Sequence, residues 1–168
     1  RMSSAARSLL LLSGPNLNLF GSRQPEIYGT ATLDDMVELA RGVAAGSGWE
    51  LRHLQSNHEG VLIDAIHEAR GTTAAIVINA GAFTHYAWAL HDALSTYDGV
   101  VVELHVSNPA ARESWRHVSV ISSVATAVIA GAGVLGYDLA VRAAVGLADA
   151  RGARAEPALP STASPDPA

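Results

Sequence analysis

The alternation of short apolar runs with amphipathic stretches most constrains how this chain can fold. Leu9–Leu12 and Ala74–Ile78 contain no polar residue, which is typical of strands buried on both faces of a parallel sheet. Residues Leu33–Ala44 instead carry apolar side chains at helical spacing. Strands alternating with helices predict an α/β fold, with a parallel sheet covered on both faces and right-handed crossovers.

The same patterns predict five strands, and the alternating polarity of the second indicates a sheet edge. We place the strands at Leu9–Ser13, Trp49–Gln55, Thr73–Asn79, Val100–Val106 and Ala125–Ala130. Four helices are expected, the first capped by Thr32 and ended by Gly46 and Gly48, the others at Val61–Arg70, Tyr86–Ser95 and Val134–Leu147. We predict one domain over residues 8–147, a disordered leader over 1–7, and a disordered Pro/Ala/Ser tail over 148–168.

Composition excludes several function classes. Eleven basic residues against 16 acidic ones give a net charge of −5, which argues against nucleic-acid partners and a basic membrane surface. The uncharged span Val118–Tyr137 fits a strand, a turn and a helix start better than a membrane helix, so we expect a soluble, cytoplasmic protein. There is no cysteine and no lysine, which excludes thiol nucleophiles, thiolate metal sites and Schiff-base catalysis.

A long loop, Gly14–Gly29, follows the first strand and carries Arg23 and Tyr28. Long loops in compact domains are usually functional or disordered. An arginine beside a phenol stabilises the phenolate and lowers its pKa from about 10, which would supply a base near neutral pH. The alternative is an arginine stacked on a tyrosine at the surface of the loop.

Glu103 and His105 stand two apart at the end of a strand, so they point to the same side. A carboxylate beside an imidazole fixes its tautomer and favours its protonated form, which suits a general acid; a surface pair is the alternative. Backbone amides at Ser107 could receive a carboxylate. Arg112 and Arg116 would share a face if that segment is helical, forming an anion clamp, although two such arginines are usually solvated.

The third loop and the last one carry further candidates. Asn79, His85 and Asp92 are spaced to surround a polyhydroxylated ligand, although Asp92 could equally be a solvent-facing helix residue. Residues Gly131–Gly136 match a dinucleotide-binding fingerprint. That motif follows the last strand, so no later strand can bring an acidic residue to a ribose, and we interpret its glycines as structural. The histidines show no spacing typical of a helical zinc pair.

Taken together and in order, these motifs resemble the type II 3-dehydroquinate dehydratases over about Leu9–Leu147. The resemblance rests on Gly14-Pro15-Asn16-Leu17-Asn18 with Arg23 and Pro25-Glu26-Ile27-Tyr28-Gly29, on Gln55-Ser56-Asn57-His58-Glu59-Gly60, on Asn79-Ala80-Gly81-Ala82 with Thr84-His85, on Glu103-Leu104-His105-Val106-Ser107-Asn108, and on Arg112-Glu113 with Arg116-His117. It implies a flavodoxin-like, doubly wound, five-stranded parallel sheet. It also implies a homododecamer built from trimers and cofactor-free, metal-free anti elimination of water from the anionic substrate 3-dehydroquinate in the shikimate pathway.

The resemblance also implies residue roles. The catalytic set would be Tyr28 as base, Arg23 as stabiliser of its phenolate, Asn16 as holder of a water on the enolate oxygen, and His105, beside Glu103, as acid. Substrate binding would fall to Val106 and Ser107 at the carboxylate, to Asn79, His85, Asp92 and Arg116 at the ring oxygens, and to Gly81 and Arg112.

The sequence departs from the family pattern near Pro109 and Ala110, where Val or Ile and then His are usual, and at Tyr86-Ala87 and His91. Two alternatives therefore stay open. One is a dehydratase acting on an amino analogue of dehydroquinate in a secondary pathway. The other is a non-catalytic flavodoxin-like module that binds flavin or acts as a signalling receiver, although the acidic cluster and lysine of a receiver are missing.

Overall fold

The computed structural model describes residues 7–22 and 30–155 of the chain. Arg23 and Tyr28 therefore lie outside the described residues. The strands are β1 (Ser8–Ser13), β2 (Glu50–Gln55), β3 (Ala75–Asn79), β4 (Val100–His105) and β5 (Ala127–Ala130), and the α-helices are α2 (Leu33–Gly46), α3 (Glu59–Ala69), α4 (Trp88–Ser95) and α5 (Leu135–Ala155). Short 3-10 helices occupy the loops: η2 (Leu17–Leu19), η3 (Gly81–His85), η4 (Pro109–Ala111), η5 (Ser114–Arg116) and η6 (Ser122–Val124).

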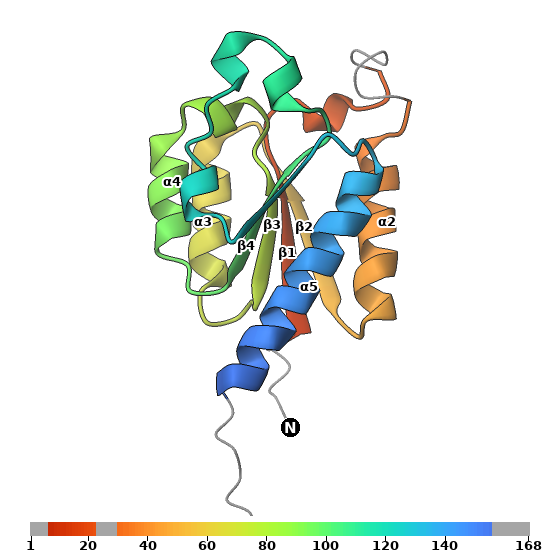
Figure 1. Cartoon of the computed structure of the whole chain (residues 1–168), viewed down its shortest axis with the longest axis vertical. Helices are drawn as coiled ribbons and strands as arrows, with labels where there is room; N and C mark the ends of the chain where they lie inside the picture. Colours follow the sequence, from red (N-terminus) through yellow and green to blue (C-terminus); the bar gives the residue numbers. More distant parts are fainter. Residues whose placement is uncertain (1–6, 23–29, 156–168) are drawn as a thin grey trace, which may run out of the picture.

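All five strands are parallel and lie in the order β2-β1-β3-β4-β5. This is the flavodoxin-like order of a doubly wound sheet, so the predicted fold is confirmed, as is the edge position of β2. The strand order reverses between β1 and β3, and ligands of such sheets bind beyond the carboxyl ends of the strands at that switch point. The loops that carry the predicted site gather at this end of the sheet (Figure 1).

Alternate side chains of β1 enter two separate hydrophobic cores. Leu9 and Leu11 pack into the core that α2 and α5 cover, whereas Leu10 and Leu12 pack into the core beneath α3 and α4. Figure 1 shows these two helix pairs on opposite faces of the sheet. Burial on both faces explains why the strand sequence has no polar residue, because each side chain leaves water whichever way it points.

Two local sequence signals behave as predicted. Thr32 caps α2 through a capping box with Asp35, in which each side chain accepts a hydrogen bond from the other residue's backbone N–H. Gly131 and Gly133 adopt left-handed backbone conformations, with φ of 83° and 60°. A Cβ on Gly136 would lie 3.1 Å from Leu104 Cδ1. The glycines of the last loop therefore serve tight turning and close helix–sheet packing.

Helix α5 is longer than predicted. It continues to Ala155, eight residues past the predicted end at Leu147, so the predicted tail from residue 148 was wrong for residues 148–155. These residues are rich in alanine and arginine, which are good helix formers, and the Arg151 guanidinium donates to Asp98 O at 3.3 Å and to Thr126 Oγ1 at 3.4 Å. In the part of the chain that the structure describes, no helix is long and apolar enough to cross a membrane.

Replacing Arg151 with alanine should lower the free energy of unfolding by about 0.5–1.5 kcal/mol, because it removes two hydrogen bonds that dock the end of α5. The melting temperature should fall by roughly 2–4 °C per kcal/mol, as monitored by circular dichroism. Arg154→Ala is the matched control, since Arg154 is exposed in the last turn of the same helix. Equal effects of the two changes would show that the Arg151 contacts do not dock the helix.

Candidate active site

A cavity lies where β1, β3 and β4 end. It is lined by Leu17, Phe20, Asn79, Gly81, His85, His105, Val106, Ser107, Pro109, Arg112 and Arg116. A second hollow shares Leu17, Phe20, Gly81 and Arg116 with it and adds Pro15, Asn16 and Ala82. The loops after three strands thus form one depression at the switch point of the sheet.

The structure brings most of the predicted site residues together. The cavity contains the predicted Asn79, Gly81, His85, His105, Val106, Ser107, Arg112 and Arg116. Asn16 lines the adjoining hollow, and Glu103 lies buried behind His105 with 1% of its surface exposed. Asp92 lies on the exposed side of α4 and lines neither hollow. Arg23 and Tyr28 fall in the undescribed part of the loop, so their placement stays a prediction.

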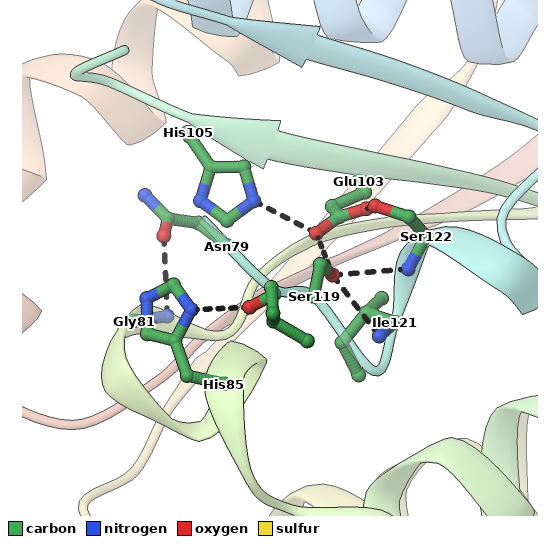
Figure 2. A network of polar contacts seen from close by, with 9 residues as sticks. Asn79, Gly81, His85, Glu103, His105, Ser119, Ile121 and Ser122 are labelled. Atoms are coloured by element: carbon green, nitrogen blue, oxygen red, sulfur yellow. Dashed lines mark hydrogen bonds and ion pairs between the residues drawn. The ribbon is translucent and has the colours of Figure 1, made fainter. Parts of the chain in front are cut away.

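His105 and Glu103 form the predicted pair. His105 Nε2 lies 2.8 Å from Glu103 Oε1 (Figure 2), and both residues come from β4, where a spacing of two puts side chains on one face. Burial, the largest single influence, raises the pKa of Glu103. Hydrogen bonds from His105, Ser119 and Ser122 outweigh it and hold the pKa below the ordinary value. An anionic carboxylate can only accept, so Nε2 carries a proton and Nδ1 is the nitrogen left for a ligand.

In His85 the protein contacts the other ring nitrogen, Nδ1, and leaves Nε2 for a ligand. Its Nδ1 lies 2.7 Å from the Val118 carbonyl oxygen. A carbonyl only accepts, so Nδ1 carries the proton and Nε2 of the neutral ring is an acceptor. Burial lowers the pKa of His85, and the nearby Arg116 and His105 lower it further against the raising effect of Val118 and Glu103. The two histidines therefore present different ring nitrogens to the pocket, Nε2 of His85 and Nδ1 of His105.

Two arginines give the pocket its positive charge. The Arg112 side chain, 12% exposed, donates to Ser107 Oγ at 3.2 Å. Arg116 donates to Glu113 Oε2 at 2.7 Å, and its guanidinium lies 4.0 Å from the Trp115 ring centroid. The two arginines belong to no common helix, because η4 ends before Arg112 and η5 begins after it. The condition for a shared helical face is therefore not met, and the two arginines line the same cavity from successive turns.

Asn16 adopts a left-handed conformation with φ of 65°, which no other non-glycine residue does in the described ranges. Its backbone N–H donates to Asn57 Oδ1 at 2.9 Å, and Gln55 Nε2 donates to the same oxygen at 3.1 Å. Strained backbone of this kind persists where its surroundings fix it, and it clusters at functional sites. The Gln55–Asn57 turn, which belongs to one of the quoted motifs, thereby holds Asn16 beside the pocket.

Sequence reasoning missed several residues that shape the site. Leu17 and Phe20 form its apolar wall, although their place next to Asn16 in a functional loop was a usable signal. The hydroxyls of Ser119 and Ser122 donate hydrogen bonds to Glu103, although these serines lie 16 and 19 residues after it in the sequence. Their spacing does not indicate that contact. Among residues 7–22 and 30–155, no group of three or more histidine, cysteine, aspartate or glutamate side chains is placed to hold a metal ion.

Comparison with known proteins agrees with this geometry. The family model described as "Dehydroquinase class II" matches residues 7–145. A protein named catabolic 3-dehydroquinase 2, from Aspergillus flavus, is 56% identical over 82% of this chain and 92% of its own length. A 3-dehydroquinate dehydratase 1 from Corynebacterium efficiens is 59% identical over 79% of this chain and 88% of its own.

Solved structures show the same likeness in three dimensions. The type II dehydroquinase from Butyrivibrio crossotus is 39% identical and superposes with a TM-score of 0.81, over 83% of this chain and 97% of that one. That from Propionibacterium acnes, also 39% identical, gives 0.79 over 85% and 97%. The fold, the pocket and these matches agree, and the chain therefore belongs to the class II dehydroquinases, a family of enzymes.

Proposed function

We propose that this enzyme is a 3-dehydroquinate dehydratase that eliminates water from 3-dehydroquinate to give 3-dehydroshikimate. The observation that carries the proposal is the His105–Glu103 pair at a cavity lined by Arg112 and Arg116. A proton donor beside two fixed cations suits loss of a hydroxyl from a small anionic substrate. The names of the relatives support the same reaction.

In the proposed mechanism, the Tyr28 phenolate removes a C2 proton beside the ketone, and Arg23 stabilises the phenolate. The electron pair moves to the ketone oxygen as an enolate, which a water held by Asn16 stabilises. His105, acting as an imidazolium with protons on both nitrogens, then gives its Nδ1 proton to the C1 hydroxyl as the C1–O bond breaks, and it keeps the Nε2 proton that faces Glu103. The enolate returns its electrons to form the C1–C2 double bond, and the hydroxyl leaves as water. The proton gained by Tyr28 and the one lost by His105 balance, so no cofactor or metal is needed.

Substrate recognition follows from the pocket lining. Val106 and Ser107 would hold the carboxylate, and the hydrogen bond from Arg112 to Ser107 Oγ brings positive charge to that point. His85 Nε2, as an acceptor, suits a ring hydroxyl, and Asn79 and Arg116 lie in the same cavity. We keep Gly81 in this set because it lines both hollows. Asp92 stays in it only as implied by the family resemblance.

We further propose a cytoplasmic role in the shikimate pathway of aromatic amino-acid biosynthesis. The relatives include proteins named as catabolic and others named without that word, and the elimination is the same chemistry in either role. Loss of aromatic prototrophy on deletion of the gene, restored by shikimate, would support the biosynthetic role. Unimpaired growth without aromatic supplements would contradict it.

We also propose assembly into a homododecamer built from trimers. The family resemblance implies this assembly, and large apolar side chains stand exposed around α4, with Tyr86 at 59% and Trp88 at 64%. Single exposed apolar residues are ordinary, but two large exposed aromatic side chains so close in the sequence are suited to a contact between subunits. Sedimentation velocity should give a single species of about twelve chains. A monomer would contradict the proposal.

The activity is tested by incubating the protein with 3-dehydroquinate and following the conjugated enone of the product in the ultraviolet. Absorbance should rise with a rate proportional to enzyme concentration, and exhaustive chelation should leave that rate unchanged. A protein that folds but gives no enone would contradict the proposed function.

Replacing Ala110 with histidine should lower the Michaelis constant for dehydroquinate several-fold. Pro109 lines the cavity and fixes φ near −65°, and Ala110 stands where similar proteins have an imidazole. One regained hydrogen bond is worth about 0.5–1.5 kcal/mol, or a few-fold to roughly ten-fold in affinity. Steady-state kinetics check this, with turnover expected to change less.

Ala111→His serves as the control, because it places the imidazole one residue further along the exposed turn. Suppose that Ala110→His leaves dehydroquinate kinetics untouched while the native protein prefers an amino-substituted dehydroquinate. The turn at Pro109 would then be adapted to that analogue, and the second candidate function, a dehydratase of a secondary pathway, would be favoured.

A further inference from the structure

One short segment, Val118–Ser122, contacts both histidine sites of the pocket (Figure 2). The Val118 carbonyl accepts from His85 at one end, and the hydroxyls of Ser119 and Ser122 donate to Glu103 at the other. In between, the Val120 N–H donates to Thr84 O at 2.8 Å, which ties the segment to η3. The 118–122 segment is therefore a fixed bridge between η3 and the end of β4.

The hydrogen of the Ser119 hydroxyl has a defined direction. Ser119 Oγ accepts from the backbone N–H of Ile121 at 3.1 Å and of Ser122 at 3.0 Å. These two donors occupy both of its lone pairs, so its own hydrogen points at Glu103 Oε1, 2.6 Å away. Ser122 donates to the other carboxylate oxygen, Oε2.

Glu103 is thus surrounded by donors. Oε1 receives His105 Nε2–H and the Ser119 hydroxyl, and Oε2 receives Ser122. A proton on Oε1 would find no acceptor in Ser119, which has no lone pair left to give. A buried carboxylate without such partners would favour its neutral form. The two hydroxyls therefore offset the burial of the charge, and the charge in turn fixes the proton on His105 Nε2.

We propose that Ser119 and Ser122 are positioning residues that hold Glu103 as an anion against His105 Nε2, so that His105 Nδ1 is the atom that protonates the leaving group. This rests on the proposed function, in which His105 is the general acid. The serines touch no substrate and act through Glu103. Among the residues that the structure describes, the other titratable and charged side chains lining the cavity are His85, Arg112 and Arg116, and none of them is altered in the test.

The test uses Ser122→Ala in the full chain, since Ser119 also accepts the backbone bonds of its turn and could fail to fold when changed. Glutamate labelled with ¹³C at its carboxyl carbon follows the titration of Glu103, assigned by the signal missing in Glu103→Gln. We expect Glu103 to titrate at higher pH in Ser122→Ala than in wild type. The value of kcat at pH 5 should fall about ten-fold, with kcat at pH 8 and KM within about two-fold of wild type.

Two matched variants separate positioning from general disturbance. Ser122→Thr keeps the hydroxyl and should restore both the titration and the pH profile. Ser123→Ala removes a hydroxyl from the exposed neighbour and should leave both unchanged. An unchanged Glu103 titration in Ser122→Ala, or equal loss at pH 5 and pH 8, would overturn the role of the serines. Absence of enone formation by the wild type would instead contradict the proposed function, so the two failures are distinguishable.

Discussion

Tyr28→Phe should reduce turnover of 3-dehydroquinate by about 10²–10⁴-fold, because a phenyl ring cannot accept the C2 proton. Substrate affinity should stay near the wild-type value, since the carboxylate and ring contacts proposed for Ser107, His85 and Arg116 are untouched. Steady-state kinetics with a binding measurement on a non-reacting substrate analogue separates these two quantities. The expected pattern is a large fall in kcat with little change in the dissociation constant.

Tyr86→Phe is the control, because Tyr86 is 59% exposed and lines neither hollow of the site. Its kinetics should match the wild type. Near-normal turnover in Tyr28→Phe would end the assignment of Tyr28 as the base. A base would then have to be sought among the other groups of the pocket.

Gly14→Ala should lower the free energy of unfolding by about 1–3 kcal/mol or more, because an added methyl group meets backbone. A Cβ on Gly14 would lie 2.3 Å from the carbonyl oxygen of Ala80 and 2.5 Å from its carbonyl carbon. Gly14 cannot move aside freely, since its N–H donates to Asn79 O at 2.8 Å. Urea denaturation measures the loss. We also expect KM to rise, as Asn79 and Gly81 would be displaced from the cavity.

Gly42→Ala should have the opposite effect. Gly42 lies within α2, and no atom lies within 4 Å of the Cβ it would gain. Replacing glycine by alanine at such a helical position stabilises by about 0.5–1 kcal/mol, because the unfolded chain has less backbone freedom to lose. If both variants proved equally stable, the close approach of Gly14 to the end of β3 would not be the constraint described here.

Much of the fold follows from local sequence because β1 and β3 are buried on both faces and read as unbroken apolar runs. Thr32 and Gly48 likewise mark the ends of a helix, Thr32 through capping and Gly48 through its left-handed backbone with φ of 74°. The length of α5 was not predictable in this way. Its last two turns depend on Arg151 reaching Asp98 and Thr126, and long-range contacts of that kind leave no periodic signal.

The sequence predicted the site best where its residues lie at the ends of strands. Glu103 and His105 are two apart on β4, and pairing follows from the period of a strand. The tautomer of His85 could not be predicted from the sequence, because it depends on the backbone carbonyl of a residue 33 positions away. Every residue has a backbone carbonyl, so no residue type indicates which one His85 contacts. The prediction also differs from the structure for Asp92. The family resemblance implied that both Asp92 and Arg112 bind the ligand, but only Arg112 lines the cavity.

The anchoring of the 118–122 segment couples the orientation of His85 to the contacts of Glu103, so local unfolding of the segment would remove both together. Release of Val120 from Thr84 would carry away the carbonyl that orients His85 and the hydroxyls that hold Glu103. Such an opening would also disturb the core beneath α3 and α4, because Val120 and Ile121 are buried in it. The enzyme would then alternate between a fully competent and a fully incompetent pocket, with activity set by the population of the closed form.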